Sequence, residues 1–288
     1  MSNTQIDYSE LSVSADYERV AAKYRPIFNK IAEGTLQRET EIILPFEPIH
    51  WLKQAGFGAV RVPIKYGGDG LSLPQLFKLL IELAKADSNI VQALRGHFAF
   101  VEDRLIAHRD QNQQLWFNRF VQGDLVGNAW TEVGSVKIGE VVTRVTRSAQ
   151  GQLEVNGSKY YSTGSIFADW IDLYAYDDVN QRSVIAAVNR HDPGVRVLDD
   201  WDGFGQKTTG SGTLTLNKVP VEEAHLIAFE ERFQYQTAYY QQFHLVTLTG
   251  IAQSAVASFS HEVRERKRIF SHGNADLVRH DAQVLQVI

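Results

Sequence analysis

The stretch that decides the fold is residues 125–164, LVGNAWTEVGSVKIGEVVTRVTRSAQGQLEVNGSKYYSTG. Before it, apolar residues recur at intervals of three and four, which is typical of amphipathic helices. From Val126 to Val219, apolar and polar residues alternate between Gly- and Asp-rich turns, which predicts short strands. After Pro220 the chain has a helical pattern again, because residues 229–270 contain no proline. The sequence therefore predicts a strand-rich insert between two helical blocks.

These changes of pattern predict an α+β multidomain chain. We expect an N-terminal all-α domain over residues 1–123, a central antiparallel β-barrel or sandwich domain over residues 124–227, and the start of a C-terminal helical bundle over residues 228–288. The sequence ends in the apolar run QVLQVI, without a capping signal. We therefore expect a C-terminally truncated chain whose bundle is incomplete.

Two local patterns make sharper predictions. Residues 89–108 place apolar side chains on one line, which predicts a single helix with His97 on its buried stripe. Such a histidine is more often a core residue than a catalytic one. Asn156-Gly157 stands between two alternating runs and is typical of a two-residue hairpin turn. Residues 159–163 are then expected to form the returning strand.

Composition and charge exclude several classes of function. The 288 residues are 44% hydrophobic and carry a net charge of −5, which predicts a globular core and argues against nucleic acid or an anionic membrane as partner. No apolar run approaches the roughly 20 residues that span a bilayer. The N-terminus, MSNTQIDYSE, lacks the features of a secretory signal. We expect a cytoplasmic protein.

Sulfur is almost absent from the sequence. There is no cysteine, and the only methionine is Met1, so disulfides, thiolate metal sites and cysteine nucleophiles are excluded. Drift or avoidance of thermolabile residues would explain this composition. Production under sulfur scarcity would explain it equally well.

Several common catalytic patterns are missing. The sequence contains no P-loop, no HExxH motif and no GxGxxG after a strand. The Gly-rich residues 203–212 are better explained as a turn between strands than as a phosphate loop, because no helix follows them. No metal site is expected. Four histidines lack ligand spacing and are predicted to be solvated: His191, His225, His272 and His280.

A cradle for a flat, amphipathic cofactor such as an isoalloxazine ring fits the remaining pattern. Such a ring needs apolar walls and a few polar groups at its edge. The candidate polar groups are Asn128, Thr131, Ser162 and Thr163, and the candidate walls are Trp130, Tyr161 and Trp201. Each of these residues alone is explained as well by ordinary packing or turn formation.

Several segments resemble those of the acyl-CoA dehydrogenase superfamily, in the same order along essentially the whole chain. Residues 56–70, GFGAVRVPIKYGGDG, match its "G...VP..YGG.G" loop. Residues 127–132, GNAWTE, and residues 156–164, NGSKYYSTG, match its two flavin-cradling segments, and residues 200–205 and 264–268 match a later turn and a basic helix. The resemblance implies that superfamily's fold.

The resemblance also implies roles for single residues. Thr163 matches a residue near flavin N5, and Asn128 and Thr131 match groups around the pyrimidine edge. Tyr161 matches an aromatic side chain beside the ring. Arg266, within one or two positions, matches a basic residue that reaches the cofactor phosphate of a neighbouring subunit in a homotetramer. On the residues alone, this basic cluster is equally well a solvated helix end.

Details favour the oxygenating branch of the superfamily. Residues 132–139, EVGSVKIG, lack the Gly-Ser-Gly-Ser-Asp type loop of the dehydrogenases. GNAWTE is similar to the GNA-x-S-E of reduced-flavin monooxygenases of the dibenzothiophene monooxygenase type, in which His97 would match an active-site histidine. The branch implies reduced FMN from a separate NAD(P)H-dependent flavin reductase, O2, a small organosulfur substrate in sulfur acquisition, and His97 and Thr163 as catalytic residues.

Two alternatives stay open. A true acyl-CoA dehydrogenase would use FAD and a catalytic carboxylate on late helices, beyond Ile288 in most members. A catalytically incomplete flavin-binding fragment is the other alternative, because the oxygenases also take an active-site histidine from those helices.

Overall fold

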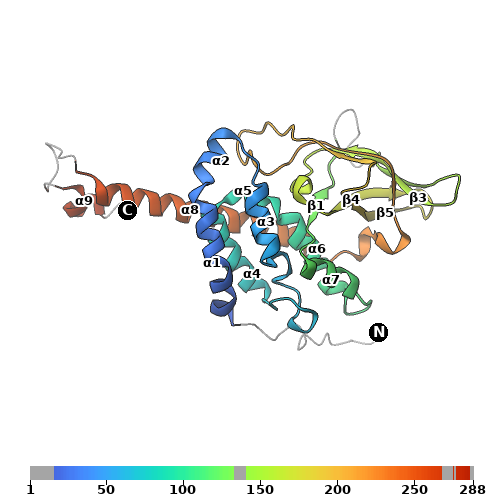
Figure 1. Cartoon of the computed structure of the whole chain (residues 1–288), viewed down its shortest axis with the longest axis horizontal. Coiled ribbons are helices and arrows are strands. Elements are labelled where there is room, and N and C mark those ends of the chain that lie inside the picture. The colour runs from blue at the N-terminus through green and yellow to red at the C-terminus, as the bar shows by residue number, and fades with distance from the viewer. Residues whose placement is uncertain (1–15, 133–140, 268–274, 276, 286–288) are drawn as a thin grey trace.

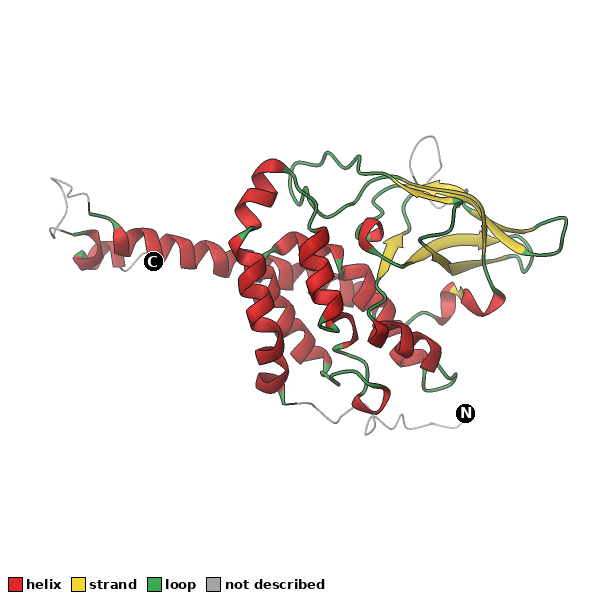
Figure 2. Ribbon diagram, in the orientation of Figure 1, coloured by secondary structure: helices red, strands yellow, loops and turns green. Residues whose placement is uncertain are grey.

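A computed structural model describes residues 16–132, 141–267, 275 and 277–285 (Figure 1). A block of helices carries the strands on one side, and the longest helix passes behind the block and projects beyond it (Figure 2). The helices are α1 Tyr17–Glu33, α2 Thr35–Glu41, α3 Phe46–Gln54, α4 Leu73–Ala86, α5 Ser88–Ala93, α6 Arg95–Ala107, α7 Gln114–Gln122, α8 Gln236–Glu265 and α9 Ala282–Leu285. The strands are β1 Val126–Ala129, β2 Arg144–Arg147, β3 Leu153–Lys159, β4 Trp170–Asp177, β5 Arg182–Asn189, β6 Val195–Val197, β7 Leu214–Pro220 and β8 Leu226–Ala228.

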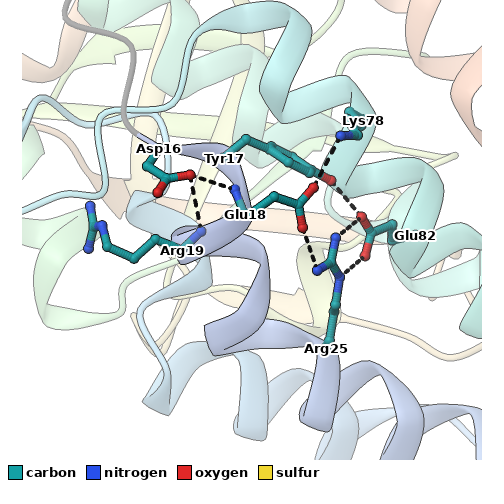
Figure 3. Close-up of polar contacts among 7 residues, drawn as sticks. All are labelled: Asp16, Tyr17, Glu18, Arg19, Arg25, Lys78 and Glu82. Atoms are coloured by element: carbon teal, nitrogen blue, oxygen red, sulfur yellow. Dashed lines mark hydrogen bonds and ion pairs between the residues drawn. The ribbon is translucent and has the colours of Figure 1, made fainter.

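Polar contacts fasten α1 to α4 at the edge of the helical core (Figure 3). Arg25 donates to the two carboxylate oxygens of Glu82 at 2.8 and 2.9 Å and to Glu18 at 2.7 Å. The Tyr17 hydroxyl also donates to Glu82, at 2.7 Å. Arg25 lowers the pKa of the Glu82 carboxyl, so this pair stays charged at neutral pH. Because Arg25 and Glu18 are largely exposed, these contacts orient the two helices more than they stabilise them.

Helix α8 crosses α4 at very close range. A Cβ at Gly250 would lie 2.3 Å from the Ala84 Cβ, so only glycine permits this approach. One face of α8 buries Tyr239, Phe243 and Val246 in the helical core. The other face leaves apolar side chains exposed: Leu245, Leu248, Ile251, Val256 and Phe259. In the described part of the chain, no helix has the length and apolar character needed to cross a membrane.

The helix predicted over residues 89–108 is divided in two. Helix α5 ends at Ala93 and α6 begins at Arg95, with Leu94 between them at φ −84° and ψ −2°. The predicted apolar line is nevertheless buried, His97 included. Periodicity does not reveal the break, because the backbone angles at Leu94 stay close to helical values.

The described strands form one mixed sheet. Its order is β6-β7-β3-β2-β4-β5-β8, and β1 pairs with β4 outside this path. Most pairs are antiparallel, but β1 and β2 both run parallel to β4. The path ends at β6 and β8 without closing, so the predicted antiparallel barrel or sandwich is corrected to an open mixed sheet in an α+β chain. Alternation of apolar residues predicts strands but carries no signal of their direction.

The predicted hairpin turn at Asn156-Gly157 is wrong. Strand β3 runs through both residues to Lys159, and its pairing with β7 shifts register between Val155 and Gly157. A Cβ at residue 157 would lie 2.5 Å from Thr143 Oγ1. A β-bulge and the close approach of Thr143 therefore explain this glycine.

Buried charges join the sheet to the helical block, and we call Asp103, Asp172 and Arg232 the junction network. Arg232, which precedes α8, donates from Nη1 to Asp172 Oδ2 on β4 at 3.0 Å, and its Nε lies 3.7 Å from Asp103 Oδ1 on α6. The Trp130 indole N–H donates to Asp172 at 2.8 Å. Burial opposes the charge on Arg232, but the carboxylates of Asp172 and Asp103 outweigh it and raise its pKa. The network therefore joins α6, β4 and the segment before α8 through buried charges, each of which would be costly without its partner.

Candidate flavin site

Thr163 belongs to a buried chain of hydroxyl groups. Its Oγ1 lies 2.9 Å from Ser211 Oγ, which lies 2.7 Å from Thr209 Oγ1. Thr209 in turn donates to the backbone carbonyl of Gln206 at 2.9 Å. The neighbouring Ser162 is fully buried, and its hydroxyl donates to the Gly212 carbonyl at 2.7 Å, so the backbone already binds it.

Asn128 lies at the end of β1 against the start of α6. Its backbone N–H donates to the Thr163 carbonyl at 3.3 Å, which brings the two predicted cradle segments together. Its side-chain Oδ1 is buried without a hydrogen-bond partner among the described residues. A Cβ at Gly96 would lie 2.8 Å from this oxygen. A buried amide oxygen without a partner is costly, so it is a candidate ligand contact.

Close backbone packing holds these segments in place. A Cβ at Gly127 would lie 2.4 Å from the Ser165 Cα. A Cβ at Gly164 would lie 2.0 Å from the Ala93 carbonyl oxygen at the end of α5, and Gly164 has φ +77°. The GNA and STG sequences therefore need their glycines for contact between β1, residues 161–165 and α5.

The predicted aromatic walls form two separate groups. The Tyr161 and Trp201 ring centroids are 5.7 Å apart, and Tyr161 is 47% exposed. Trp130 instead packs against Phe229 at 5.8 Å and Tyr240 at 6.2 Å. Tyr161 has φ +55°, an uncommon value for a residue with a side chain. Such strain is typical of functional positions, where it directs a side chain toward a ligand.

Glu132 anchors the end of the first cradle segment. Its carboxylate accepts from the Lys159 ammonium at 2.7 Å and from the backbone N–H groups of Val142 and Thr143 at 2.7 and 2.8 Å. Burial opposes the charge, but these donors lower the pKa of Glu132 to about 2. The Thr131 carbonyl accepts from Tyr160 N at 2.9 Å. Residues 133–140, which include most of the segment compared with the dehydrogenase loop, lie outside the described residues.

His97, to which the resemblance assigns a catalytic role, lies in a closed environment of backbone groups. The ring is fully buried, its Nε2 donates to the Gly58 carbonyl at 2.9 Å, and its Nδ1 accepts from Val126 N at 3.2 Å. Burial lowers the pKa of His97 to about 4. Since both ring nitrogens bind backbone groups, neutral His97 fixes α6 to β1 and to the 56–70 loop.

The other predicted residues are placed as follows. His225 is buried beside Arg119, whose Nη1 lies 3.2 Å from His225 Nε2, so the prediction that it is solvated is wrong. His272 lies outside the described residues. Arg266 follows the last residue of α8, far along the projecting helix (Figure 1). No group of side chains suited to a metal ion occurs in the described ranges.

Sequence reasoning missed two groups near the cradle. Thr209 and Ser211 come from the Gly-rich residues 203–212, which were interpreted only as a turn. The only sequence signal that could have marked them as polar groups of the cradle is their hydroxyl side chains. Arg95 lies next to Gly96, which packs on Asn128, and nothing in its local sequence marks it.

Comparison with known proteins gives several homologues, although no family model matches the chain. YdbM of Bacillus subtilis, named as an acyl-CoA dehydrogenase, is 27% identical over 64% of this chain and 49% of its own length. SfnC of Pseudomonas putida, named as an FMNH2-dependent monooxygenase, is 24% identical over 70% of this chain and 50% of its own length. Dibenzothiophene monooxygenase of Rhodococcus erythropolis is 28% identical over 63% of this chain and 45% of its own length. The chain is a homologue of these proteins. It spans about half the length of the curated relatives it matches.

Solved structures share the fold over nearly the whole chain. FMN-bound TdsC from Paenibacillus sp. A11-2 superimposes with a TM-score of 0.80 at 23% identity, covering 93% of this chain and 71% of TdsC. Methanesulfinate monooxygenase MsuC from Pseudomonas fluorescens gives a TM-score of 0.81 at 23% identity, covering 93% and 69%. The homologues and this fold confirm the resemblance to the acyl-CoA dehydrogenase superfamily.

The described residues fit the isoalloxazine ring of a flavin. Asn128 offers an amide oxygen without a partner, and Thr163 offers a hydroxyl at the end of a buried chain. Tyr161 and Trp201 offer aromatic surface, part of it exposed. A flat ring with polar edges needs these kinds of contact.

Proposed function

We propose that this chain is the flavin-binding part of a two-component monooxygenase. It uses reduced FMN, supplied by a separate NAD(P)H-dependent flavin reductase, and O2 to oxygenate a small organosulfur compound. SfnC and TdsC support the cofactor, and dibenzothiophene monooxygenase and MsuC support the substrate class. A sequence without cysteine suits an enzyme made when sulfur is scarce. Reduced FMN, when bound, supplies the electrons that reduce one oxygen atom to water while the other passes to sulfur.

The direction of the hydroxyl chain carries this proposal. The Gln206 carbonyl can only accept, so Thr209 uses its proton there and accepts from Ser211. Ser211 at 2.9 Å then accepts from Thr163 in preference to the Tyr161 carbonyl at 3.5 Å, and the Thr163 oxygen keeps free lone pairs. Thr163 therefore faces the flavin as an acceptor. Reduced flavin has an N–H at N5, whereas oxidised flavin has a bare acceptor nitrogen there, so this arrangement favours the reduced form.

Anaerobic calorimetry with reduced FMN, oxidised FMN and FAD tests the proposal. We expect the tightest binding for reduced FMN, followed by O2 uptake and sulfur oxygenation when an organosulfur panel is supplied. Preference for FAD, with bleaching by an acyl-CoA, would assign the chain to the dehydrogenases. Failure to bind any flavin would contradict the proposal outright.

The Ser211→Ala variant tests the hydroxyl direction. It frees the Thr163 proton, so the preference for reduced over oxidised FMN should fall by about tenfold, the worth of one hydrogen bond of roughly 1.4 kcal/mol. Ser158→Ala is the control, because the Ser158 hydroxyl also donates to a backbone carbonyl, that of Leu214, but outside the chain. An unchanged preference in Ser211→Ala would refute the assigned direction.

We also propose a homotetramer in which Arg266 reaches the FMN phosphate of a neighbouring subunit. The exposed apolar face of α8 supports an assembly through this helix. Light scattering should give a mass above that of a monomer, and Leu248→Glu should lower it. Arg266→Gln should weaken binding of FMN but not of riboflavin, which has no phosphate. A monomeric mass that Leu248→Glu does not change, together with an FMN affinity that Arg266→Gln does not change, would contradict this assembly.

A further inference from the structure

Arg95, Tyr240 and His244 meet beside the candidate flavin site, and we call them the open cluster. Arg95 begins α6, and the other two residues lie one turn apart on α8. The Arg95 guanidinium carbon is 5.3 Å from the centre of the Tyr240 ring, and its Nη1 lies 3.5 Å from His244 Nε2. All three side chains are partly buried rather than closed off in the core.

Arg95 has a charge that no carboxylate of the described residues balances. Among the described residues it forms no ion pair with a carboxylate, and its Nε is buried without a hydrogen-bond partner. Burial lowers its pKa, and only Tyr240 acts in the opposite direction. Burial and Arg95 both lower the pKa of His244. Partial burial of a cation that stays protonated is costly unless an anion pairs with it.

The neighbouring carboxylates are already engaged. Asp172 and Asp103 influence Tyr240, but both belong to the junction network and face Arg232. The groups that remain around Arg95 are a tyrosine ring and a histidine. The open cluster therefore attracts anions and lacks one of its own.

The open cluster also lies directly next to the cradle. Gly96, the residue after Arg95, packs on the Asn128 side chain, which has an oxygen without a partner. Tyr240 packs on Trp130 of the first cradle segment, with ring centroids 6.2 Å apart. The open cluster therefore adjoins the first cradle segment through Gly96 and Tyr240.

We propose that the open cluster binds an anionic group of the substrate, so that the enzyme takes organosulfur compounds that carry an oxyanion and still have a lone pair on sulfur, such as a sulfinate, rather than neutral sulfides and sulfones. This inference rests on the proposed function, which makes the bound organosulfur compound a substrate. A guanidinium presents paired N–H groups that match two oxygens of such an anion. The same chemistry would also suit the phosphate of FMN, and the experiment separates these two sources.

Calorimetry with benzenesulfinate and its neutral analogue methyl phenyl sulfone tests the inference, with and without reduced FMN under anaerobic conditions. We expect the sulfinate to bind at least tenfold more tightly than the sulfone. Arg95→Gln should abolish this preference. Arg95→Lys should keep part of it, because lysine retains the positive charge but lacks the paired N–H groups of the guanidinium. Arg190→Gln is the matched control, since Arg190 also has a buried Nε without a partner and a pKa lowered by burial, but follows β5.

Equal binding of sulfinate and sulfone by the parent chain would overturn the inference. So would an Arg95→Gln variant that binds FMN less well but riboflavin equally, because Arg95 would then contact the flavin phosphate. If no flavin binds, the proposed function fails by itself, and sulfinate preference in the flavin-free protein still decides the inference. Melting curves confirm that each variant is folded.

Discussion

Arg232 and Arg95 both influence Tyr240, yet the chain treats their charges in opposite ways. Arg232 faces Asp172 and Asp103, whose carboxylates raise its pKa despite burial. Arg95 has no such partner in the part of the chain that the structure describes, and burial lowers its pKa. A charge balanced within the chain holds elements together, whereas a charge left unbalanced is available to a ligand. The same contrast separates His97, whose nitrogens both bind backbone, from Asn128, whose oxygen is unpaired.

The largest effect is expected in the junction network. Asp172→Ala leaves Arg232 buried with one distant carboxylate and should lower the free energy of unfolding by about 3–5 kcal/mol. Chemical denaturation measures this. Asp178→Ala removes a surface pair with Arg144 and should cost about 1 kcal/mol or less. Similar losses in the two variants would remove the distinction between paired buried charge and surface charge.

His97 gives a pH signature of the internally satisfied region. Its pKa is about 4 in the folded chain against an ordinary 6.5, so the unfolded chain binds a proton that the folded chain does not. Its contribution to stability is complete above pH 6.5 and is lost as the pH falls toward 4, by roughly 3 kcal/mol. Unfolding curves of His97→Gln should lack this slope, while the exposed-site variant His50→Gln should keep it. A slope that survives in His97→Gln would show that another titrating group, not His97, causes it.

Tyr161 tests whether strain at the cradle serves binding. Tyr161→Gly relieves φ +55° and should leave stability equal or raise it by up to about 1 kcal/mol, while reduced FMN binds about tenfold more weakly. Gln181→Gly relieves φ +54° in the turn between β4 and β5. It should change the free energy of unfolding as Tyr161→Gly does, but leave the affinity for FMN unchanged. Equal FMN affinity in the two variants would deny Tyr161 a place in the cradle.

The smallest change in stability is expected for Arg95→Gln. Because no carboxylate loses its partner, the free energy of unfolding should change by less than about 1 kcal/mol, or rise as a buried charge is removed. Denaturation beside Asp172→Ala makes the comparison direct. A loss of several kcal/mol in Arg95→Gln would place Arg95 among the structural charges and end the contrast.

Local sequence was enough for much of the fold. The helices before residue 125, the strands between Val126 and Val219 and the helix after Pro220 were predicted because apolar side chains repeat at the period of each element. The order of segments and the GNA and STG motifs also indicated that Asn128 and Thr163 belong together, and the structure joins them through a backbone hydrogen bond. The hairpin at Asn156-Gly157 failed because a glycine that permits a turn also permits a bulge.

The sequence by itself determined where helices and strands form, that His97 is buried, and which segments resemble a flavin cradle. Only the tertiary structure decided that β1 and β2 run parallel to β4, that His97 binds backbone at both nitrogens, and that Thr163 continues into Ser211 and Thr209. It also placed Arg95 against Tyr240 and left it without a carboxylate. The physical reason is distance along the chain: periodicity reports neighbours within a few residues, whereas hydrogen-bond direction and charge balance depend on groups brought together from remote segments.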